Sequence, residues 1–181
     1  MACEDDITTV VAGRPLVLPR PDGDTGPRSA AALVLATYKA SGLDLVECLH
    51  GQFSFAIIDR AARRVALAID RMGIERLAYA TIDSGIVFSS SALAVAKCPP
   101  FRPRLRRQAV YDYLVHHMVP GPGTIFTGVF KLPPASLAVF EDARIDVRRY
   151  WKPVFASATN TSFRDLKEQL VDSLKEAVID Q

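Results

Sequence analysis

Residues 52–59 (QFSFAIID) and residues 65–70 (VALAID) are the most informative part of the sequence about the fold. The first segment begins with alternating polar and apolar side chains and the second is almost continuously apolar, as is typical of β-strands. The polar segment between them, residues 60–64 (RAARR), is short enough for a hairpin, so the two strands are predicted to pair antiparallel. Nearly continuous apolar strands indicate a sheet that is covered on both faces.

Further elements are predicted on both sides of this hairpin. Downstream we expect short strands at 77–81 and 86–89, a helix at 108–118, and strands near 136–140 and 145–150. Upstream we expect a β-prone run at 7–11, a Pro/Gly/Asp-rich loop at 19–27, a helix from Ser29 to Gly42 and a short helix at 43–49. Because no βαβ unit repeats, the pattern favours an α+β fold with antiparallel sheets over a doubly wound nucleotide fold.

The composition indicates one globular domain without membrane attachment. The chain has 181 residues, of which 49% are hydrophobic and 23% charged, and its net charge is +2. This composition excludes wholesale disorder and gives no overall attraction to nucleic acid or anionic lipid. No apolar run has the 18 residues that a membrane helix needs, and the acidic start is unlike a signal peptide. We therefore expect a cytoplasmic protein.

The cysteines and histidines predict neither a disulfide framework nor a metal site. Cys3, Cys48 and Cys98 are widely spaced and form no Cys-x-x-Cys pair. Adjacent residues on a helix point about 100° apart, so His116 and His117 are poorly placed to chelate one ion. Cys48 lies in an apolar, helix-like run and is interpreted as a small buried hydrophobic residue.

Two further segments invite a binding role. Four arginines at 102, 104, 106 and 107 precede the helix predicted at 108–118. Because no aromatic residues alternate with them, we favour a solvated strip or a docking face for a neighbouring domain over nucleic-acid binding. Residues 119–123 (VPGPG) contain two prolines, which lack the N–H donors of a phosphate-binding loop, so we interpret them as a rigid turn.

The C-terminal part of the sequence has a different character. Residues 155–162 are rich in Ala, Ser, Thr and Asn, as in a linker. An apolar stripe then follows at helical spacing, formed by Phe163, Leu166, Leu170, Leu174 and Val178. We therefore expect a division into a domain at 1–154 and, at 155–181, a linker with the first helix of an absent second domain.

Several motifs, taken in order, resemble the glutaminase domain of the asparagine synthase family, a type-2 glutamine amidotransferase. The first half carries residues 49–59 (LHGQFSFAIID), 68–80 (AIDRMGIERLAYA) and 87–90 (VFSS). The second half carries residues 111–114 (YDYL), 120–126 (PGPGTIF), 128–134 (GVFKLPP) and 149–151 (RYW). The resemblance covers roughly residues 7–181.

The resemblance implies a fold and a chemistry. The fold would be that of N-terminal-nucleophile hydrolases, a four-layer αββα sandwich of antiparallel sheets, here missing its first strands. In the family an N-terminal cysteine attacks the glutamine amide, with its own α-amino group as base. A C-terminal synthetase domain then uses ATP and Mg²⁺ to activate a carboxylate for ammonia. We expect this chain to bind neither cofactor and to partner such a domain or a separate ligase subunit.

The reactive centre departs from the family pattern at three positions. Cys3 follows Met1 and Ala2, and only nine residues separate it from Gly13. The family's Asn-Gly oxyanion pair corresponds to Ala12-Gly13, and its substrate-binding aspartate corresponds to Ala30. We therefore expect no catalytic residue in this chain, with Gly13 as the one candidate substrate contact. The pair Asp70-Arg71 is interpreted as tying a strand end to the following loop.

Three hypotheses follow from this sequence. The first is a glutaminase-like scaffold domain for an ATP-dependent, amide-forming domain. The second is an active glutaminase for asparagine synthesis whose nucleophile cysteine lies upstream of a misassigned start. The third is a binding module that presents the strip at 102–107 to an acidic partner. An open sheet edge left by missing strands would also favour a homodimer.

Overall fold

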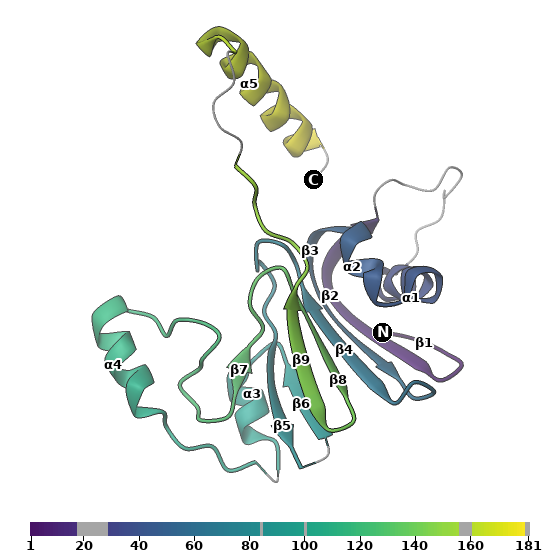
Figure 1. The fold of residues 1–181 in the computed structure, drawn as a ribbon, viewed down its shortest axis with the longest axis vertical. Coiled ribbons are helices and arrows are strands. Elements are labelled where there is room, and N and C mark those ends of the chain that lie inside the picture. The colour runs from purple at the N-terminus through teal and green to yellow at the C-terminus, as the bar shows by residue number, and fades with distance from the viewer. Residues whose placement is uncertain (18–28, 84, 100, 156–160, 180–181) are drawn as a thin grey trace.

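The computed structural model describes residues 1–17, 29–83, 85–99, 101–155 and 161–179 (Figure 1). The strands are β1 Ala2–Glu4, β2 Ile7–Val17, β3 Leu49–Asp59, β4 Arg64–Ile69, β5 Ala78–Ile82, β6 Gly85–Ser89, β7 Phe130–Lys131, β8 Ser136–Glu141 and β9 Arg144–Arg149. The helices are α1 Ala30–Ser41, the 3₁₀ turn η1 Gly42–Asp44, α2 Leu45–Cys48, α3 Ala92–Lys97, α4 Arg107–His116 and α5 Phe163–Ile179. The loop predicted at 19–27 lies outside the described residues.

The described strands form two antiparallel sheets. The first has the order β1-β2-β3-β4-β8-β9 and the second the order β6-β5-β7. Strands β3 and β4 pair from Ser54 opposite Ile69 to Asp59 opposite Arg64, which confirms the predicted hairpin. Strand β2 pairs with β3 along its whole length, from Ile7 opposite Asp59 to Val17 opposite Leu49.

Alternating side chains of the first sheet sort into two apolar layers. Phe53, Phe55 and Ile57 of β3 pack with residues of α1 and α2. Ala56, on the opposite face of β3, packs between the two sheets with Leu67, Ile69, Leu77, Tyr79, Leu132 and Ala138. A third cluster joins β5 to α3 through Ala78, Ala80, Val95, Ala96 and Val129.

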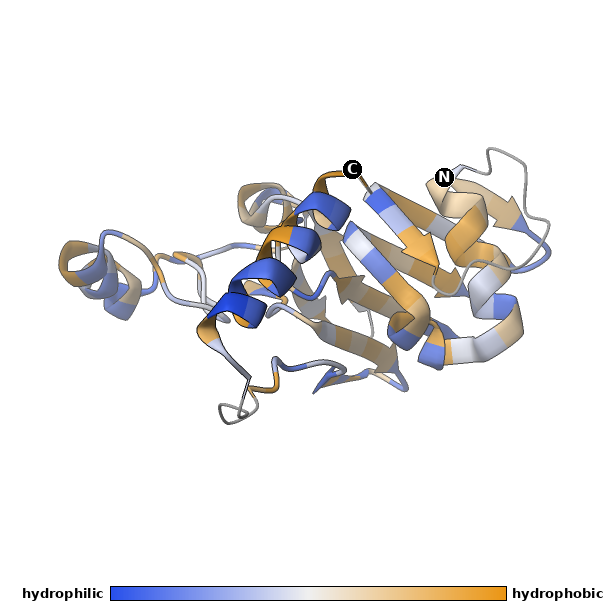
Figure 2. Ribbon diagram, turned by 90° about the horizontal axis from the view of Figure 1, so that it is seen from above, coloured by the Kyte–Doolittle hydropathy of each residue, from blue (hydrophilic) through white to orange (hydrophobic). Residues whose placement is uncertain are grey.

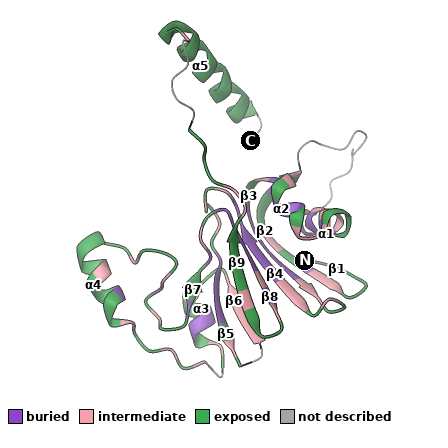
Figure 3. Cartoon of the chain, viewed as in Figure 1, coloured by how far each residue is buried: buried purple, intermediate pink, exposed green. Residues whose placement is uncertain are grey.

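These clusters define four layers: α1 and α2, the first sheet, the second sheet, and α3. In Figure 3 the buried residues concentrate in the strands and in the helices that cover them. The predicted four-layer αββα arrangement of antiparallel sheets is therefore confirmed. The prediction that first strands of the family fold are missing concerns no described residue and stays a prediction.

Local sequence signals explain the ends of α1. Ser29 caps the helix by accepting a hydrogen bond from the Ala32 N–H at 3.2 Å. At the other end Gly42 has φ +59°, and its N–H donates to the Tyr38 carbonyl. Both ends agree with the predicted helix from Ser29 to Gly42.

The two edges of the first sheet differ in character. Strand β1 has three residues. Strand β9 presents exposed arginines, at 144, 148 and 149. Short strands and charged side chains both oppose edge-to-edge pairing between molecules. Strand β1 covers only residues 7–9 of β2, however, and the homodimer expected from an open sheet edge stays a prediction.

Candidate functional site

Gly13 lies on β2 opposite Phe53 of β3, with no room for a side chain. Its φ is +87°, and a Cβ at this position would lie 2.4 Å from the Gln52 carbonyl oxygen. Gly51 on the facing strand has φ +81°, and a Cβ there would lie 2.7 Å from the Arg14 carbonyl oxygen. The backbone thus requires glycine at both positions. Gly13 as a substrate contact stays a prediction.

The structure does not bring Cys3 to Gly13. Cys3 is exposed on β1 opposite Thr8, with its Sγ 3.5 Å from the Thr8 Oγ1. Gly13 lies five residues beyond Thr8 on β2, which corresponds to about 17 Å at the rise of an antiparallel strand. Oxyanion-hole donors must lie about 3 Å from the oxygen that they stabilise. Cys3 and Gly13 therefore do not form one reactive centre.

Ala30 begins α1, which packs against β2. The helix is tied to this strand where the Thr9 hydroxyl donates to the Ala31 carbonyl at 3.0 Å, and Thr9 is fully buried. No acidic residue lies in the first turn of α1. The helix start therefore carries no carboxylate in place of the aspartate that the family resemblance implies for this position.

A cleft of about 580 Å³ opens beside Gly13, where β2 and β3 meet the loop that follows β4. Its lining residues are Arg14 and Leu16 of β2, His50, Gly51 and Gln52 of β3, and Asp70, Arg71, Met72 and Ile74 of the loop. We call it the β2–β3 cleft.

Asp70 organises the loop of the β2–β3 cleft. Its side chain is buried, and Oδ1 accepts hydrogen bonds from the backbone N–H groups of Met72 and Ile74, both at 3.0 Å. Oδ2 accepts from the Glu75 N–H at 2.9 Å. Asp70 thus ties the strand end to the loop, as predicted, but it does so by accepting hydrogen bonds from backbone N–H groups of the loop. The interpretation of an Asp70–Arg71 pair is corrected, because Arg71 has other partners.

Arg71 is held by three groups from distant parts of the chain. Its Nη2 donates to the Glu47 carbonyl at 3.4 Å and lies 3.2 Å from the His50 Nε2. The guanidinium carbon lies 5.7 Å from the centre of the Trp151 ring, a cation–π contact. The Nε is buried and has no hydrogen-bond partner among the described residues. Sequence reasoning missed this cluster because β3, the loop and the segment after β9 carry no shared local motif.

The contact with Arg71 fixes the protonation state of His50. A guanidinium has no acceptor, so the His50 Nε2 must accept and the ring is neutral with its proton on Nδ1. Burial lowers the pKa of His50 below its usual 6.5, and repulsion from Arg71 lowers it further. His50 is therefore a neutral acceptor at neutral pH.

An NMR titration is expected to give a pKa below 6.5 for His50. Because the folded-state pKa is lowered, the contribution of His50 to stability is complete above the unfolded pKa. It is lost as the pH falls through 6.5 toward the folded-state value. In the His50→Gln variant this pH-dependent part of the unfolding free energy should vanish. A measured pKa of 6.5 or higher would contradict the assignment.

A second cleft, of about 960 Å³, lies apart from Gly13. It is lined by residues of the 73–78 segment, the start of α3, the 118–122 segment and the 131–134 segment. Its charged side chains are Glu75, Arg76, Lys131 and Arg149. None of the residues matched to the family's reactive centre lines this cleft.

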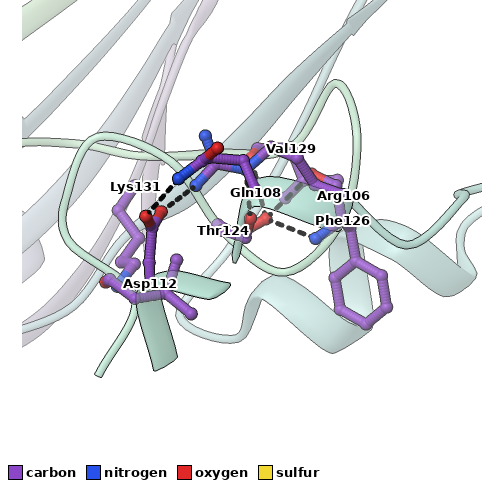
Figure 4. A network of polar contacts seen from close by, with 8 residues as sticks. Arg106, Gln108, Asp112, Thr124, Phe126, Val129 and Lys131 are labelled. Carbon is purple, nitrogen blue, oxygen red and sulfur yellow. Dashed lines mark hydrogen bonds and ion pairs between the residues drawn. The ribbon is translucent and has the colours of Figure 1, made fainter. Parts of the chain in front are cut away.

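Arg106 does not belong to an exposed arginine strip at 102–107 as predicted, because its side chain binds groups within the protein. Its Nε donates to the Thr124 carbonyl at 3.1 Å, and its Nη2 lies 3.5 Å from the Asp112 carboxylate (Figure 4). Gln108 also donates to Asp112, at 2.8 Å, and the buried Thr124 hydroxyl donates to the Val129 carbonyl at 2.8 Å. Arg106 thus anchors the start of α4. The other three arginines of the strip are exposed.

The described residues contain no group of three or more His, Cys, Asp or Glu side chains that could hold a metal ion. His116 is the last residue of α4, and His117 follows as its left-handed cap. The three cysteines are free. Among the described helices none is long and apolar enough to cross a membrane.

Comparison with protein families and curated proteins gives one consistent relationship. The family model for a glutamine amidotransferase domain matches residues 24–151. Asparagine synthetase [glutamine-hydrolyzing] 3 of Bacillus subtilis is 28% identical over 155 residues, which are 84% of this chain and 25% of that protein. A putative asparagine synthetase [glutamine-hydrolyzing] of Mycobacterium tuberculosis is 29% identical over 137 residues, 73% of this chain and 21% of that protein. The chain thus spans about a quarter of the length of these relatives.

Comparison with solved structures supports the same fold. The glutamine phosphoribosylpyrophosphate amidotransferase of Bacillus subtilis superimposes with a TM-score of 0.51 at 12% identity. The match covers 85% of this chain and 31% of that chain. At this identity the likeness concerns the fold alone.

Proposed function

This chain belongs to the family of glutamine amidotransferase domains and is related to asparagine synthetases, and we propose that it is a member that hydrolyses no glutamine. Its function would be structural: to hold and shape an ATP-dependent domain that forms an amide bond. That domain would bind ATP and Mg²⁺, and it would follow the linker and helix at 155–181 or belong to a separate ligase subunit.

The position of Cys3 supports the proposal that this chain hydrolyses no glutamine. A glutaminase of this family needs a thiol beside a free α-amine and within reach of its oxyanion hole. The Cys3 nitrogen is part of the peptide bond to Ala2 within β1, and its thiol lies opposite Thr8, about 17 Å along the sheet from Gly13. Ala12 also offers no side-chain amide, and loss of one oxyanion donor reduces a rate by about 10²–10³.

The exposed apolar side chains of α4 support the proposed structural role. This helix has ten residues and buries one, Ala109. Its large apolar side chains are exposed, namely Val110, Tyr111, Tyr113, Leu114 and Val115. Figure 1 shows α4 projecting from the sandwich on extended segments. Because isolated helices shorter than about 12–15 residues are marginal in water, α4 needs a partner surface.

Helix α5 presents a second unpartnered apolar face. None of its 17 residues is buried. Its stripe is 84% exposed at Phe163, 60% at Leu170 and 74% at Val178. In Figure 2 this helix carries orange apolar positions among blue polar ones. Monomeric proteins rarely expose contiguous apolar surface of this kind, which is typical of protein–protein contacts.

Hydrogen exchange of α4 tests the structural role. We expect its amides to exchange much faster than those of β3 in the isolated chain, and to become protected when the ATP-dependent domain of the parent system is added. The Leu114→Asp variant should abolish this protection, because it replaces an apolar side chain that is 72% exposed with a charged one. Arg107→Gln, an exposed polar position on the same helix, is the matched control.

Two results would contradict the structural role. One is exchange of α4 that stays the same after the ATP-dependent domain is added. The other is equal protection in the Leu114→Asp and Arg107→Gln variants, since a contact through the apolar face must distinguish them.

A further inference from the structure

The β2–β3 cleft has an excess of available positive charge. It is lined by two guanidinium groups, Arg14 and Arg71, and by one carboxylate, Asp70. The oxygens of Asp70 already accept three backbone hydrogen bonds, and its side chain is 1% exposed. His50 is a neutral acceptor toward Arg71. An anion that enters the cleft would therefore meet two cations and no free carboxylate from the lining.

Arg71 is oriented before any ligand arrives. Its hydrogen bonds all come from Nη2, to Glu47 and His50, and its guanidinium carbon lies over the Trp151 ring, 5.7 Å from the ring centre. The Nε has no partner among the described residues although it is buried. A buried donor without a partner costs free energy, and a guanidinium edge matches the two oxygens of a carboxylate. A carboxylate that reached the Nε would supply the absent acceptor.

Part of the lining of the cleft is apolar. Met72 and Ile74 are 71% and 61% exposed, and Leu16 is 36% exposed. These three side chains line the same cleft as the two arginines. Burial of apolar area stabilises a complex. The lining is thus matched to a ligand with an anionic head and a short apolar body.

We propose that the β2–β3 cleft binds a small carboxylic acid with a short hydrocarbon chain. Its carboxylate pairs with Arg71 and Arg14, and its hydrocarbon part lies on Leu16, Met72 and Ile74. This site goes beyond the structural role proposed above and requires no glutamine hydrolysis.

An NMR titration of the ¹⁵N-labelled full chain with pentanoate tests the site. We expect saturable shifts for the amides of Gly51, Gln52 and Met72 and for the Arg71 Nε–H. The exposed Arg14→Gln variant should bind pentanoate at least 5-fold more weakly. Arg60→Gln, at an exposed arginine in the turn between β3 and β4, is the matched control and should bind like the wild type.

Three other ligands resolve the chemistry of the site. Pentanamide has the same chain without the charge and should bind at least 10-fold more weakly than pentanoate. Acetate should also bind more weakly than pentanoate, since it has no longer hydrocarbon chain to contact Leu16, Met72 and Ile74. Inorganic phosphate should not bind more tightly than pentanoate.

Several outcomes would overturn the proposal. Equal binding of pentanoate by the Arg14→Gln and Arg60→Gln variants would show that Arg14 does not pair with the carboxylate. If pentanamide bound as tightly as pentanoate, the site would not recognise the carboxylate. If acetate bound as tightly as pentanoate, the hydrocarbon chain would make no contact that stabilises the complex. Tighter binding of phosphate, or no saturable shifts with pentanoate, would reject the assigned ligand class.

Discussion

Replacing Asp70 by alanine is expected to lower the free energy of unfolding by at least about 3 kcal/mol, because hydrogen bonds to a charged acceptor contribute about 1.5–3 kcal/mol each. The variant would leave the N–H groups of Met72, Ile74 and Glu75 without the carboxylate that now accepts from them. Asp70→Asn should cost less, since its amide oxygen can still accept. Urea denaturation measures both changes.

The matched control for Asp70 is Asp146→Ala, at an exposed position on β9. A surface substitution of this kind is expected to change stability by no more than about 0.5 kcal/mol. If Asp70→Ala were as harmless as Asp146→Ala, the loop of the β2–β3 cleft would not depend on this carboxylate.

The second large effect is expected at Gly13. In Gly13→Ala the Cβ would lie 2.4 Å from the Gln52 carbonyl oxygen, and the φ of +87° is one that L-residues rarely adopt. Backbone strain costs about 1–3 kcal/mol. Overpacking adds typically 1–3 kcal/mol. We therefore expect the unfolding free energy to fall by at least about 2 kcal/mol, the sum of the lower ends of these two ranges.

Gly42→Ala separates the two contributions at Gly13. Gly42 also has a positive φ, of +59°, but a Cβ there would meet nothing within 4 Å. The Gly13 variant should therefore lose more stability than the Gly42 variant, by the cost of the steric contact between β2 and β3. Equal losses would show that the close approach of these strands does not require glycine.

The predictable parts of the fold are those with local signals. The hairpin of β3 and β4 follows from alternation and apolar character, and α1 from its Ser29 cap and the glycine at its end. Strand β2 was predicted to end at Val11 but continues to Val17. The sequence places Gly13 and Pro15 in this segment, and both are ordinarily strand breakers. A glycine on each strand, Gly13 opposite Phe53 and Gly51 opposite Pro15, lets the pairing continue through it.

The elements that sequence analysis missed are short. Strand β1 has three residues, β7 has two and α3 has six. Such lengths give no measurable periodicity. Strand β1 is held by pairing with the adjacent β2, whereas β7 depends on a strand far along the chain. Strand β7, for example, pairs with β5 through Tyr79 opposite Phe130.

The candidate site was predictable only in part. The sequence identified Cys3, Ala12 and Ala30 as departures from the family pattern, and the sheet register adds that Cys3 lies far from Gly13. The cluster of His50, Arg71 and Trp151 was not predicted. It joins the start of β3, the loop after β4 and the segment after β9, so only the tertiary fold brings it together.

A glutamine hydrolysis assay on the purified chain tests most directly the proposal that it hydrolyses no glutamine. Glutamate and ammonia are measured for the wild type and for Cys3→Ala, which removes an exposed thiol and should leave the fold intact. We expect both proteins to release no more glutamate than buffer alone. Hydrolysis by the wild type that disappears in Cys3→Ala would contradict the account.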